Sequence, residues 1–178
     1  MTEVRLARID DAGDIAAVKA TGWRTTYAAW VPEPVLAPHL DLRAQSEAMA
    51  AELGEPPNFA VIARDADRML GFATCLLAGR SEPLLDSFHV LPEARRRGVG
   101  SALLELLARE AAARGAVALT VKVVEENVRT RALYERLGAV YVSTEPAGWA
   151  PEHVREVQYR WDDVSSLCGE GAGGTAAV

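Results

Sequence analysis

The sequence predicts an α/β fold in which helices flank a mixed β-sheet, and three observations carry that prediction. Two apolar runs joined by a polar turn, within residues 59–77, are typical of a β-hairpin. A run of strand length at 84–90 precedes an amphipathic helical stretch that begins near residue 99, and an alternating stretch follows at 117–123. Strand, helix and strand in that order indicate a parallel βαβ unit with a right-handed crossover, so parallel and antiparallel pairs share one sheet.

We expect the first part of the chain to contribute one strand and one helix. Val4 and Leu6 indicate a short strand, and Asp10 and Asp11 behind it belong to the residue types that cap helices. Apolar residues then recur at helical spacing over 12–23, which predicts the first helix.

A proline-rich stretch separates this helix from a second one. Because proline breaks regular structure, we expect an irregular connection at Pro32, Pro34 and Pro38. His39 in that connection is expected at the surface. A second helix then runs over 40–53.

The last third of the chain predicts a short helix and two strands. The helix passes through Leu133 and ends at Gly138, a residue type that readily adopts the left-handed conformation of a helix C-cap. Strands follow at 140–142 and 157–161, and Trp149 lies in the loop between them.

Length and composition are those of one domain. With 178 residues, 49% of them hydrophobic, the chain can bury one sizeable core, which we assign to residues 1–163. Residues 164–178 are rich in Gly and Ala and are expected to form a disordered tail. The chain has 19 Lys and Arg residues against 25 Asp and Glu, a net charge of −6, which argues against nucleic acid as a partner.

Targeting and metal-binding patterns are absent from the sequence. The N-terminus lacks the charged and then apolar pattern of a signal peptide, and no apolar segment reaches the length of a membrane span, so we expect a cytoplasmic protein with no membrane partner. Cys75 and Cys168 lie far apart without metal-ligand spacing, so no metal site is expected.

The segment from Val90 to Ser101 is the strongest candidate for a binding site. It reads as a strand end, a turn with three consecutive arginines and a helix start, with Gly98 and Gly100 at the turn. The first N–H groups of a helix have no intrahelical acceptors, and the helix macrodipole favours an anion there. A pyrophosphate site is therefore one reading, and a tight connection with solvated arginines is the other.

Two motifs in the right order resemble the GNAT superfamily of acetyl-CoA-dependent N-acetyltransferases. The first is Val90-x-Pro92 followed by Arg95-x-x-Gly98-x-Gly100, and the second is Asn127 followed by Leu133-Tyr134-x-x-x-Gly138. The likeness spans roughly residues 3 to 162. It implies a mixed, splayed sheet of six or seven strands flanked by about four helices. Thr130 and Ala139 depart from residues common in the family, as packing changes.

The resemblance implies acetyl-CoA as the cofactor and gives roles to two groups of residues. The turn equivalent to Arg95, Arg96, Arg97, Gly98, Val99, Gly100 and Ser101 would hold the pyrophosphate of coenzyme A, chiefly through main-chain amides. The strand end at Phe88, His89 and Val90 would splay from its parallel neighbour. The pantetheine arm would run in that gap, and main-chain donors near Val90 could polarise the thioester carbonyl.

The resemblance also implies catalytic roles. Tyr134 matches a general acid beside the thioester sulphur, and Asn127 matches a contact to the pantetheine arm, although Asn127 could equally be only a helix N-cap. The general base stays open among Glu82, Asp86, His89, His153 and an ordered water, because a bulge in the strand would alter which side chains face the cleft.

The acceptor is expected to be a primary amine of a small molecule or peptide. The substrate pocket would be lined by Trp23, Tyr27, Trp30 and Trp149, although aromatic side chains of this kind are more often part of a core. Pairing of the late strands between two chains would give a homodimer, a state that the sequence leaves open.

Two other functional classes stay open. A non-catalytic acyl-CoA-binding or sensing module would keep the glycines and would not need Tyr134. A nucleotide-binding βαβ protein fits less well, because the turn contains no Gly-Lys-Ser/Thr and position 103, where Gly-x-Gly-x-x-Gly needs a third glycine, is Leu103.

Overall fold

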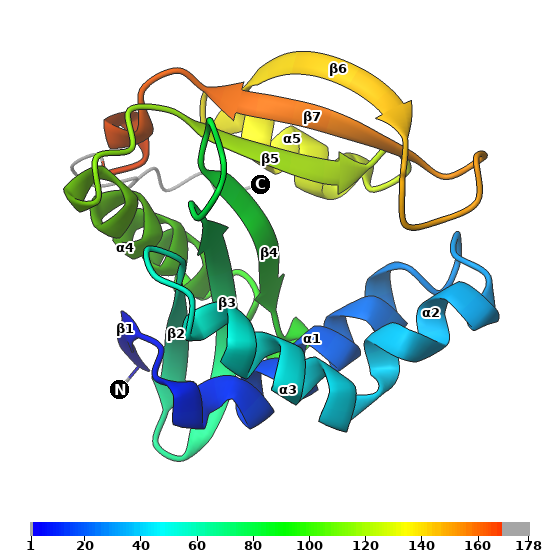
Figure 1. The fold of residues 1–178 in the computed structure, drawn as a ribbon, viewed down its shortest axis with the longest axis horizontal. Coiled ribbons are helices and arrows are strands. Elements are labelled where there is room, and N and C mark those ends of the chain that lie inside the picture. Colours follow the sequence, from blue (N-terminus) through cyan, green and yellow to red (C-terminus); the bar gives the residue numbers. More distant parts are fainter. Residues whose placement is uncertain (1, 169–178) are drawn as a thin grey trace.

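A mixed seven-stranded sheet lies at the centre of the computed structural model, which describes residues 2–168 (Figure 1). Within this range the strands follow the order β1-β2-β3-β4-β5-β7-β6, and neighbouring strands are antiparallel except β4 and β5. Their bounds are β1 (Thr2–Leu6), β2 (Phe59–Asp65), β3 (Arg68–Leu76), β4 (Leu84–Val90), β5 (Leu119–Val124), β6 (Val140–Pro146) and β7 (Arg155–Trp161).

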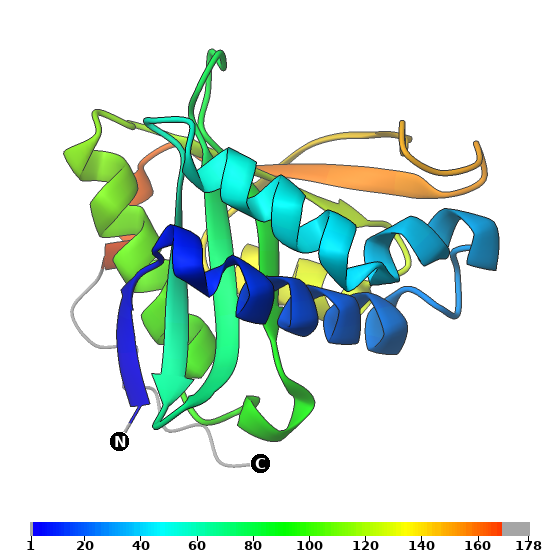
Figure 2. The same cartoon turned by 60° about the horizontal axis from the view of Figure 1, so that its bottom comes forward.

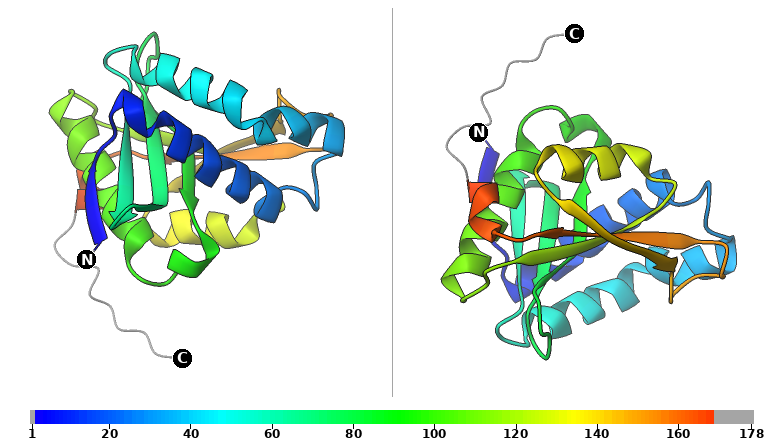
Figure 3. Two further views of the ribbon diagram at one scale, coloured as in Figure 1. Left: turned by 90° about the horizontal axis from the view of Figure 1, so that it is seen from below. Right: turned by 90° about the horizontal axis from the view of Figure 1, so that it is seen from above.

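Helices cover both faces of the sheet. Helices α1 and α3 lie on one face, and α4 and α5 lie on the other (Figure 2, Figure 3). The helix bounds are α1 (Ala12–Thr26), α2 (Glu33–Leu40), α3 (Leu42–Leu53), α4 (Val99–Ala113) and α5 (Val128–Arg136). Short 3₁₀ turns occur at Ile9–Asp11, Pro92–Ala94 and Val164–Cys168.

The two halves of the sheet part between β4 and β5. These strands pair at Leu84 with Thr120 and at Leu85 with Val121, and beyond that point residues 87–90 pair with β3 and not with β5. The expected parallel βαβ unit and the splayed, seven-stranded sheet are thus confirmed.

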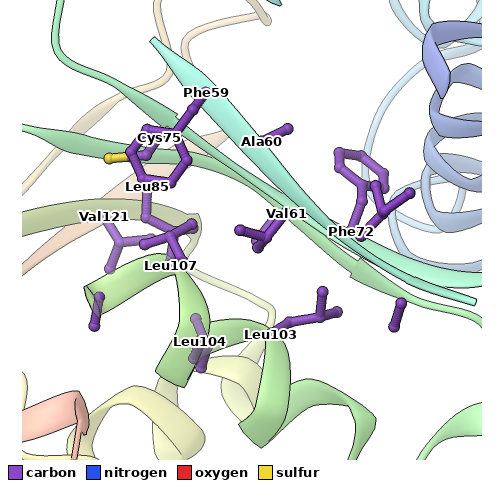
Figure 4. Packing of buried hydrophobic residues seen from close by; sticks show 14 of the residues in the cluster. Phe59, Ala60, Val61, Phe72, Cys75, Leu85, Leu103, Leu104, Leu107 and Val121 are labelled. Carbon is purple, nitrogen blue, oxygen red and sulfur yellow. The ribbon is translucent and has the colours of Figure 1, made fainter. Parts of the chain in front are cut away.

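Helix α4 holds the diverging halves together through the core. Leu103, Leu104 and Leu107 are buried and extend from α4 toward the sheet, where Val61 of β2 and Val121 of β5 also contribute to the core (Figure 4). Fully burying one leucine side chain contributes about 1.5–3 kcal/mol. The leucines that make the sequence of this helix amphipathic are therefore also the residues that form the core beside the parted strands.

Helix α2 corrects the expectation of an irregular, proline-rich connection and brings the α-helices to five within the described chain. Pro34 lies in the first turn, where a helix does not need the missing N–H. Pro38 lies inside the helix. Leu36 is buried against Trp23 and Val31, and this packing offsets the hydrogen bond that Pro38 cannot donate.

Asp11 plays a different part from the helix cap that the sequence suggests. Its side chain makes no capping hydrogen bond to α1. Instead its two carboxylate oxygens accept hydrogen bonds from the Arg5 guanidinium at 2.8 and 2.9 Å, and one of them accepts the Arg8 N–H at 2.7 Å. The Arg5 contact lowers the pKa of Asp11, more than burial raises it, and the pair ties β1 to the start of α1.

The described fold continues through residues 164–168, which the sequence assigns to the start of the tail. Val164–Cys168 form a 3₁₀ turn, Val164 is 2% exposed, and its N–H donates to the carbonyl of Val117 at 2.8 Å. The apolar Val164 and Leu167 pack against the core and keep this segment in the fold. The remainder of the predicted tail, 169–178, lies outside the described residues.

Two features of the described chain concern contact with a membrane and with a second protein chain. No helix in the described range is both long and apolar enough to cross a membrane. Strand β6 forms one edge of the sheet, and Val140 and Tyr141 on it are exposed. Pairing between chains through this edge stays a prediction.

We expect Gly71→Ala to destabilise the protein, because Gly71 of β3 lies opposite Val90 and holds β4 close. A Cβ atom at Gly71 would lie 2.7 Å from the main-chain oxygen of His89. Overpacking of this kind costs about 1–3 kcal/mol in the free energy of unfolding, which urea denaturation measures.

Gly13→Ala is the matched control, because the new Cβ would meet only Ser46 Oγ at 3.9 Å and would sit in helix α1. It should be neutral or stabilising by up to about 1 kcal/mol. Equal stability of Gly71→Ala and wild type would contradict the close approach of β3 and β4.

Candidate active site

A cleft of about 1410 Å³ opens where β4 and β5 part. Its walls come from β4, the end of β5, the second half of α1, the first turn of α4, helix α5 and the loop before β7. The predicted site residues that line it are Trp23, Tyr27, Trp30, Asp86, Phe88, His89, Val90, Arg95, Arg96, Gly98, Gly100, Ser101, Asn127, Tyr134 and Trp149. One cavity thus joins the predicted cofactor and acceptor residues.

A β-bulge shapes the wall that β4 contributes. The register with β3 shifts between Thr74 paired with Ser87 and Cys75 paired with Leu85, which leaves Asp86 as the extra residue. The Ser87 N–H donates to Thr74 Oγ1 at 3.0 Å, and the Ser87 hydroxyl donates to Asp86 Oδ2 at 3.1 Å. The bulge expected from the family resemblance is therefore present, and it places an exposed Asp86 on the cleft.

The turn before α4 has the geometry of an anion cradle. Gly98 has φ +78°, in the left-handed region, and immediately precedes the helix. A Cβ at Gly100 would lie 3.2 Å from Phe88 Cζ, so only a glycine leaves this space open. The first N–H groups of α4 face the cleft end without intrahelical acceptors. Val99 itself is buried in the core and Arg97 is exposed outside the lining, so their side chains do not contribute to the cavity.

Arginine side chains also line the cleft. Arg95 Nε donates to the main-chain oxygen of Val90 at 3.1 Å, and burial together with the charge of Arg129 lowers the pKa of Arg95. Arg96, Arg129 and Arg136 also line this cavity. Four guanidinium groups on a chain of net charge −6 make the cleft suited to an anionic ligand.

Tyr134 is positioned by helix α5. Asn127 caps the helix by accepting the Thr130 N–H at 3.3 Å, and Gly138, with φ +86°, ends it as predicted. The Tyr134 side chain is 3% exposed, and its ring lies edge-on to Trp161 with centroids 5.6 Å apart. Burial, and secondarily the neighbouring Tyr27, raises the pKa of Tyr134, so the phenol keeps its proton at neutral pH.

The predicted acceptor residues form one aromatic wall. The rings of Trp23 and Tyr27 are 4.7 Å apart, and those of Trp23 and Trp149 are 5.1 Å apart. Trp30 lies 6.4 Å from Tyr27. His39 joins them by stacking on Trp23 at 3.6 Å, so the expectation that it is a surface residue is wrong. The unexpected helix α2 explains this, because it carries His39 back onto α1.

Two candidate bases lie away from the cleft. Glu82 Oε1 accepts two hydrogen bonds from Arg160, at 3.0 and 2.9 Å, and the side chain borders a separate small hollow. His153 is exposed in the loop before β7 and is not part of the lining. Glu82, predicted as a catalytic residue, thus forms a salt bridge between the β3–β4 connection and β7 and does not join the other predicted site residues in the cleft.

His89 lies in the cleft but is a weak base. Burial, and then the positive charges of Lys19 and Arg95, lowers the pKa of His89 to about 3. Its ring packs against Phe72 with centroids 5.5 Å apart. A neutral imidazole with so low a pKa has little driving force to take a proton from an ammonium group.

The structure adds two carboxylates that sequence reasoning did not find. Glu52 of α3 has a buried Oε1 with no hydrogen-bond partner in the described structure, and burial, followed by the charge of Asp86, raises its pKa to about 7 against the opposing effect of Lys19. Glu156 of β7 lines the cleft. Neither lies in a motif, and only the packing of α3 and β7 reveals them.

Known structures share this fold. The PaiA N-acetyltransferase of Thermoplasma acidophilum, in complex with coenzyme A, aligns with 90% of this chain and 99% of its own at a TM-score of 0.72 and 15% identity. The ribosomal-protein-alanine N-acetyltransferase of Brucella melitensis aligns with 89% of this chain and 98% of its own, at 0.72 and 20%. The yncA protein of Salmonella typhimurium, with its cofactor acetyl-CoA, aligns over 99% of both chains at 0.70 and 17%.

Sequence comparison gives the family. No curated protein matches the sequence significantly. Residues 23–139, more than half of the chain, match the Acetyltransferase (GNAT) family, and this range contains the cradle at the start of α4 together with Asn127 and Tyr134. The chain therefore belongs to the GNAT family of acetyltransferases.

Proposed function

We propose that the protein transfers an acetyl group from acetyl-CoA to a primary amine of a small molecule or peptide by direct attack. One observation carries the proposal: the opening between β4 and β5 connects an anion cradle to an aromatic acceptor wall, with Tyr134 lining the same cavity. Membership of the GNAT family supports acetyl transfer as the reaction.

The residues present fit coenzyme A. The left-handed Gly98, the space that Gly100 leaves beside Phe88, and the arginines around the turn suit a diphosphate. Beyond Leu85, β4 has no neighbour on its β5 side, so its main-chain groups can bind an extended arm as a strand would. Related structures hold coenzyme A or acetyl-CoA, which supports the same ligand here.

Acetyl-CoA, when bound, supplies an acetyl group activated as a thioester. The amide groups at the start of α4 and the arginines hold and orient the ligand's phosphates. Tyr134 keeps its proton because it is buried, and its phenol would be the group in the cleft that holds a proton for the departing sulphur. Asn127, as both helix cap and part of the lining, is placed to contact the arm of the ligand.

Asp86 is the best-placed proton acceptor for the attacking amine. The bulge exposes its carboxylate to the cleft at the point where the strands part, whereas Glu82 pairs with Arg160 and His89 is a weak base. Glu52 lies close enough for its pKa to respond to the charge of Asp86.

A non-catalytic acyl-CoA-binding module is the alternative. It would use the same cradle and would release no thiol from acetyl-CoA with any amine. The binding and turnover measurements below separate the two functions.

Gly100→Val should weaken coenzyme A binding at least tenfold, because the new side chain would occupy the space beside Phe88 Cζ. Isothermal titration calorimetry with coenzyme A measures the affinity. Arg97→Ala on the same turn is the control and should change the affinity little, since that side chain lies outside the cleft. Normal affinity in Gly100→Val would remove the basis for placing the cofactor here.

Tyr134→Phe should lower kcat about a hundredfold, the scale of a lost general acid, while coenzyme A still binds. Thiol release from acetyl-CoA with a panel of primary amines measures the rate across pH. Tyr141→Phe, on the exposed strand β6, is the matched control and should retain the wild-type rate. A rate of Tyr134→Phe equal to wild type across pH would exclude the proton-donor role.

The stability of the Glu52→Gln variant relative to the wild-type protein should increase as pH rises. The pKa of Glu52 is raised from its ordinary 4.5 to about 7, so the folded state binds more protons than the unfolded state between these values. Its contribution to stability is thus complete below about 4.5 and is lost as pH rises through about 7.

Thermal unfolding at several pH values measures this effect. Glu47→Gln, at the surface of the same helix, is the control and should show no such trend. A difference in Tm between Glu52→Gln and wild type that does not change with pH would contradict a raised pKa at Glu52.

A further inference from the structure

Glu156 presents a carboxylate to the acceptor side of the cleft. It lies on β7 directly opposite Val124, the last residue of β5. Its Oε1 accepts the Trp149 Nε1–H at 2.8 Å, which fixes the carboxylate against the indole. Within the described residues, no lysine or arginine forms a salt bridge with Glu156, so its charge is left for a ligand to neutralise.

Trp149, which contacts this carboxylate, belongs to a cluster of aromatic rings with Tyr27 and Trp30. Tyr27 lies 6.4 Å from both Trp30 and Trp149, each at an interplanar angle of 71°, and all three rings line the cleft. The charge of Glu156 reaches Tyr27, where it adds to burial in raising the pKa of that phenol to about 12. Aromatic faces beside a carboxylate attract a cation and offer nothing to an anion.

We propose that Glu156, with Tyr27, Trp30 and Trp149, binds a second, cationic amino group of the acceptor, which makes the substrate an aliphatic diamine or polyamine. This inference rests on the proposed acetyl transfer to an amine and names the class of that amine.

The position of Glu156 assigns it to a distal group and not to the reacting amine. The last paired residues of β4 and β5 are Leu85 and Val121, and Asp86 follows at once. Val124, opposite Glu156, lies about 10 Å farther along β5 at the usual rise of a strand. A carboxylate that binds an ammonium group also holds it in the protonated, unreactive form, so the reacting amine needs a different partner, which the proposed reaction assigns to Asp86.

Other charged groups on this side do not reverse the preference. Lys19, Arg80 and Lys122 also line the cleft, and the carboxyl groups of Asp86 and the adjacent Glu52 oppose them. Lys122 lies on the same face as Val124, two residues away, without a salt bridge to Glu156 in the described structure. The ligand group at Glu156 is therefore decided by the carboxylate and its contact with Trp149, and not by the total charge of the cleft.

The test uses three probes with the same carbon chain. Cadaverine has a second amine, n-pentylamine has a neutral end, and aminovalerate has a carboxylate. Tryptophan fluorescence or calorimetry measures the binding of each to the whole protein, and thiol release from acetyl-CoA measures kcat/KM. We expect cadaverine to bind and react about tenfold better than n-pentylamine, and aminovalerate to be the poorest.

Glu156→Gln removes the charge and keeps an oxygen that can accept the Trp149 N–H. It should reduce the cadaverine-to-pentylamine ratio about tenfold, to near one. Glu145→Gln is the matched control, because Glu145 is exposed on β6, pairs in register with Glu156 and lies outside the cleft. That variant should retain the wild-type ratio.

The outcomes separate the two proposals. A ratio near one in wild type, an unchanged ratio in Glu156→Gln, or aminovalerate equal to cadaverine would overturn the diamine subsite while acetyl transfer stands. Absence of thiol release with every amine would overturn the proposed function, and the binding ratio would still decide whether Glu156 selects a cation.

Discussion

The divergence of β4 from β5 is the constraint on which the rest of the site depends. A parallel sheet normally satisfies its main-chain groups through neighbouring strands, and here that pairing stops after Leu85 and Val121. A bulge at Asp86 interrupts β4 at this point, and α4 buries Leu103 and Leu107 in the core that includes Val61 of β2 and Val121 of β5. An opening that would otherwise expose unpaired backbone thus becomes a place for an extended ligand.

Local patterns in the sequence predict the elements that frame this opening. The alternation and helical spacing around α4, Gly98 before it and Gly138 behind α5 depend on neighbours within a few residues, so the sequence alone specifies them. The order of the motifs around Arg95 and Tyr134 then identifies the family, because two short patterns at the right separation are far more specific than either one.

The acceptor side depends on long-range packing and is therefore less predictable. The prolines in α2 predict an irregular segment, yet it is helical and buries Leu36 against Trp23. The helix thereby places His39 against Trp23, beside the cleft. Glu82 has the spacing of a candidate base but pairs with Arg160, which is distant in sequence. Packing of α3 brings Glu52 close enough to Asp86 of β4 for that charge to raise its pKa. Pairing of β7 with β5 places Glu156 in the lining of the cleft.

Burial distinguishes the two groups that the proposed proton transfers would use. A buried phenol resists ionisation, so Tyr134 on α5 holds its proton. Asp86 is exposed to the cleft and is the proposed proton acceptor for the attacking amine. Both side chains line one cavity, so the proposed attack has both groups within the same cleft. The parting of β4 and β5 that frees main-chain groups for the cofactor therefore also brings the proposed donor and the proposed acceptor to one opening.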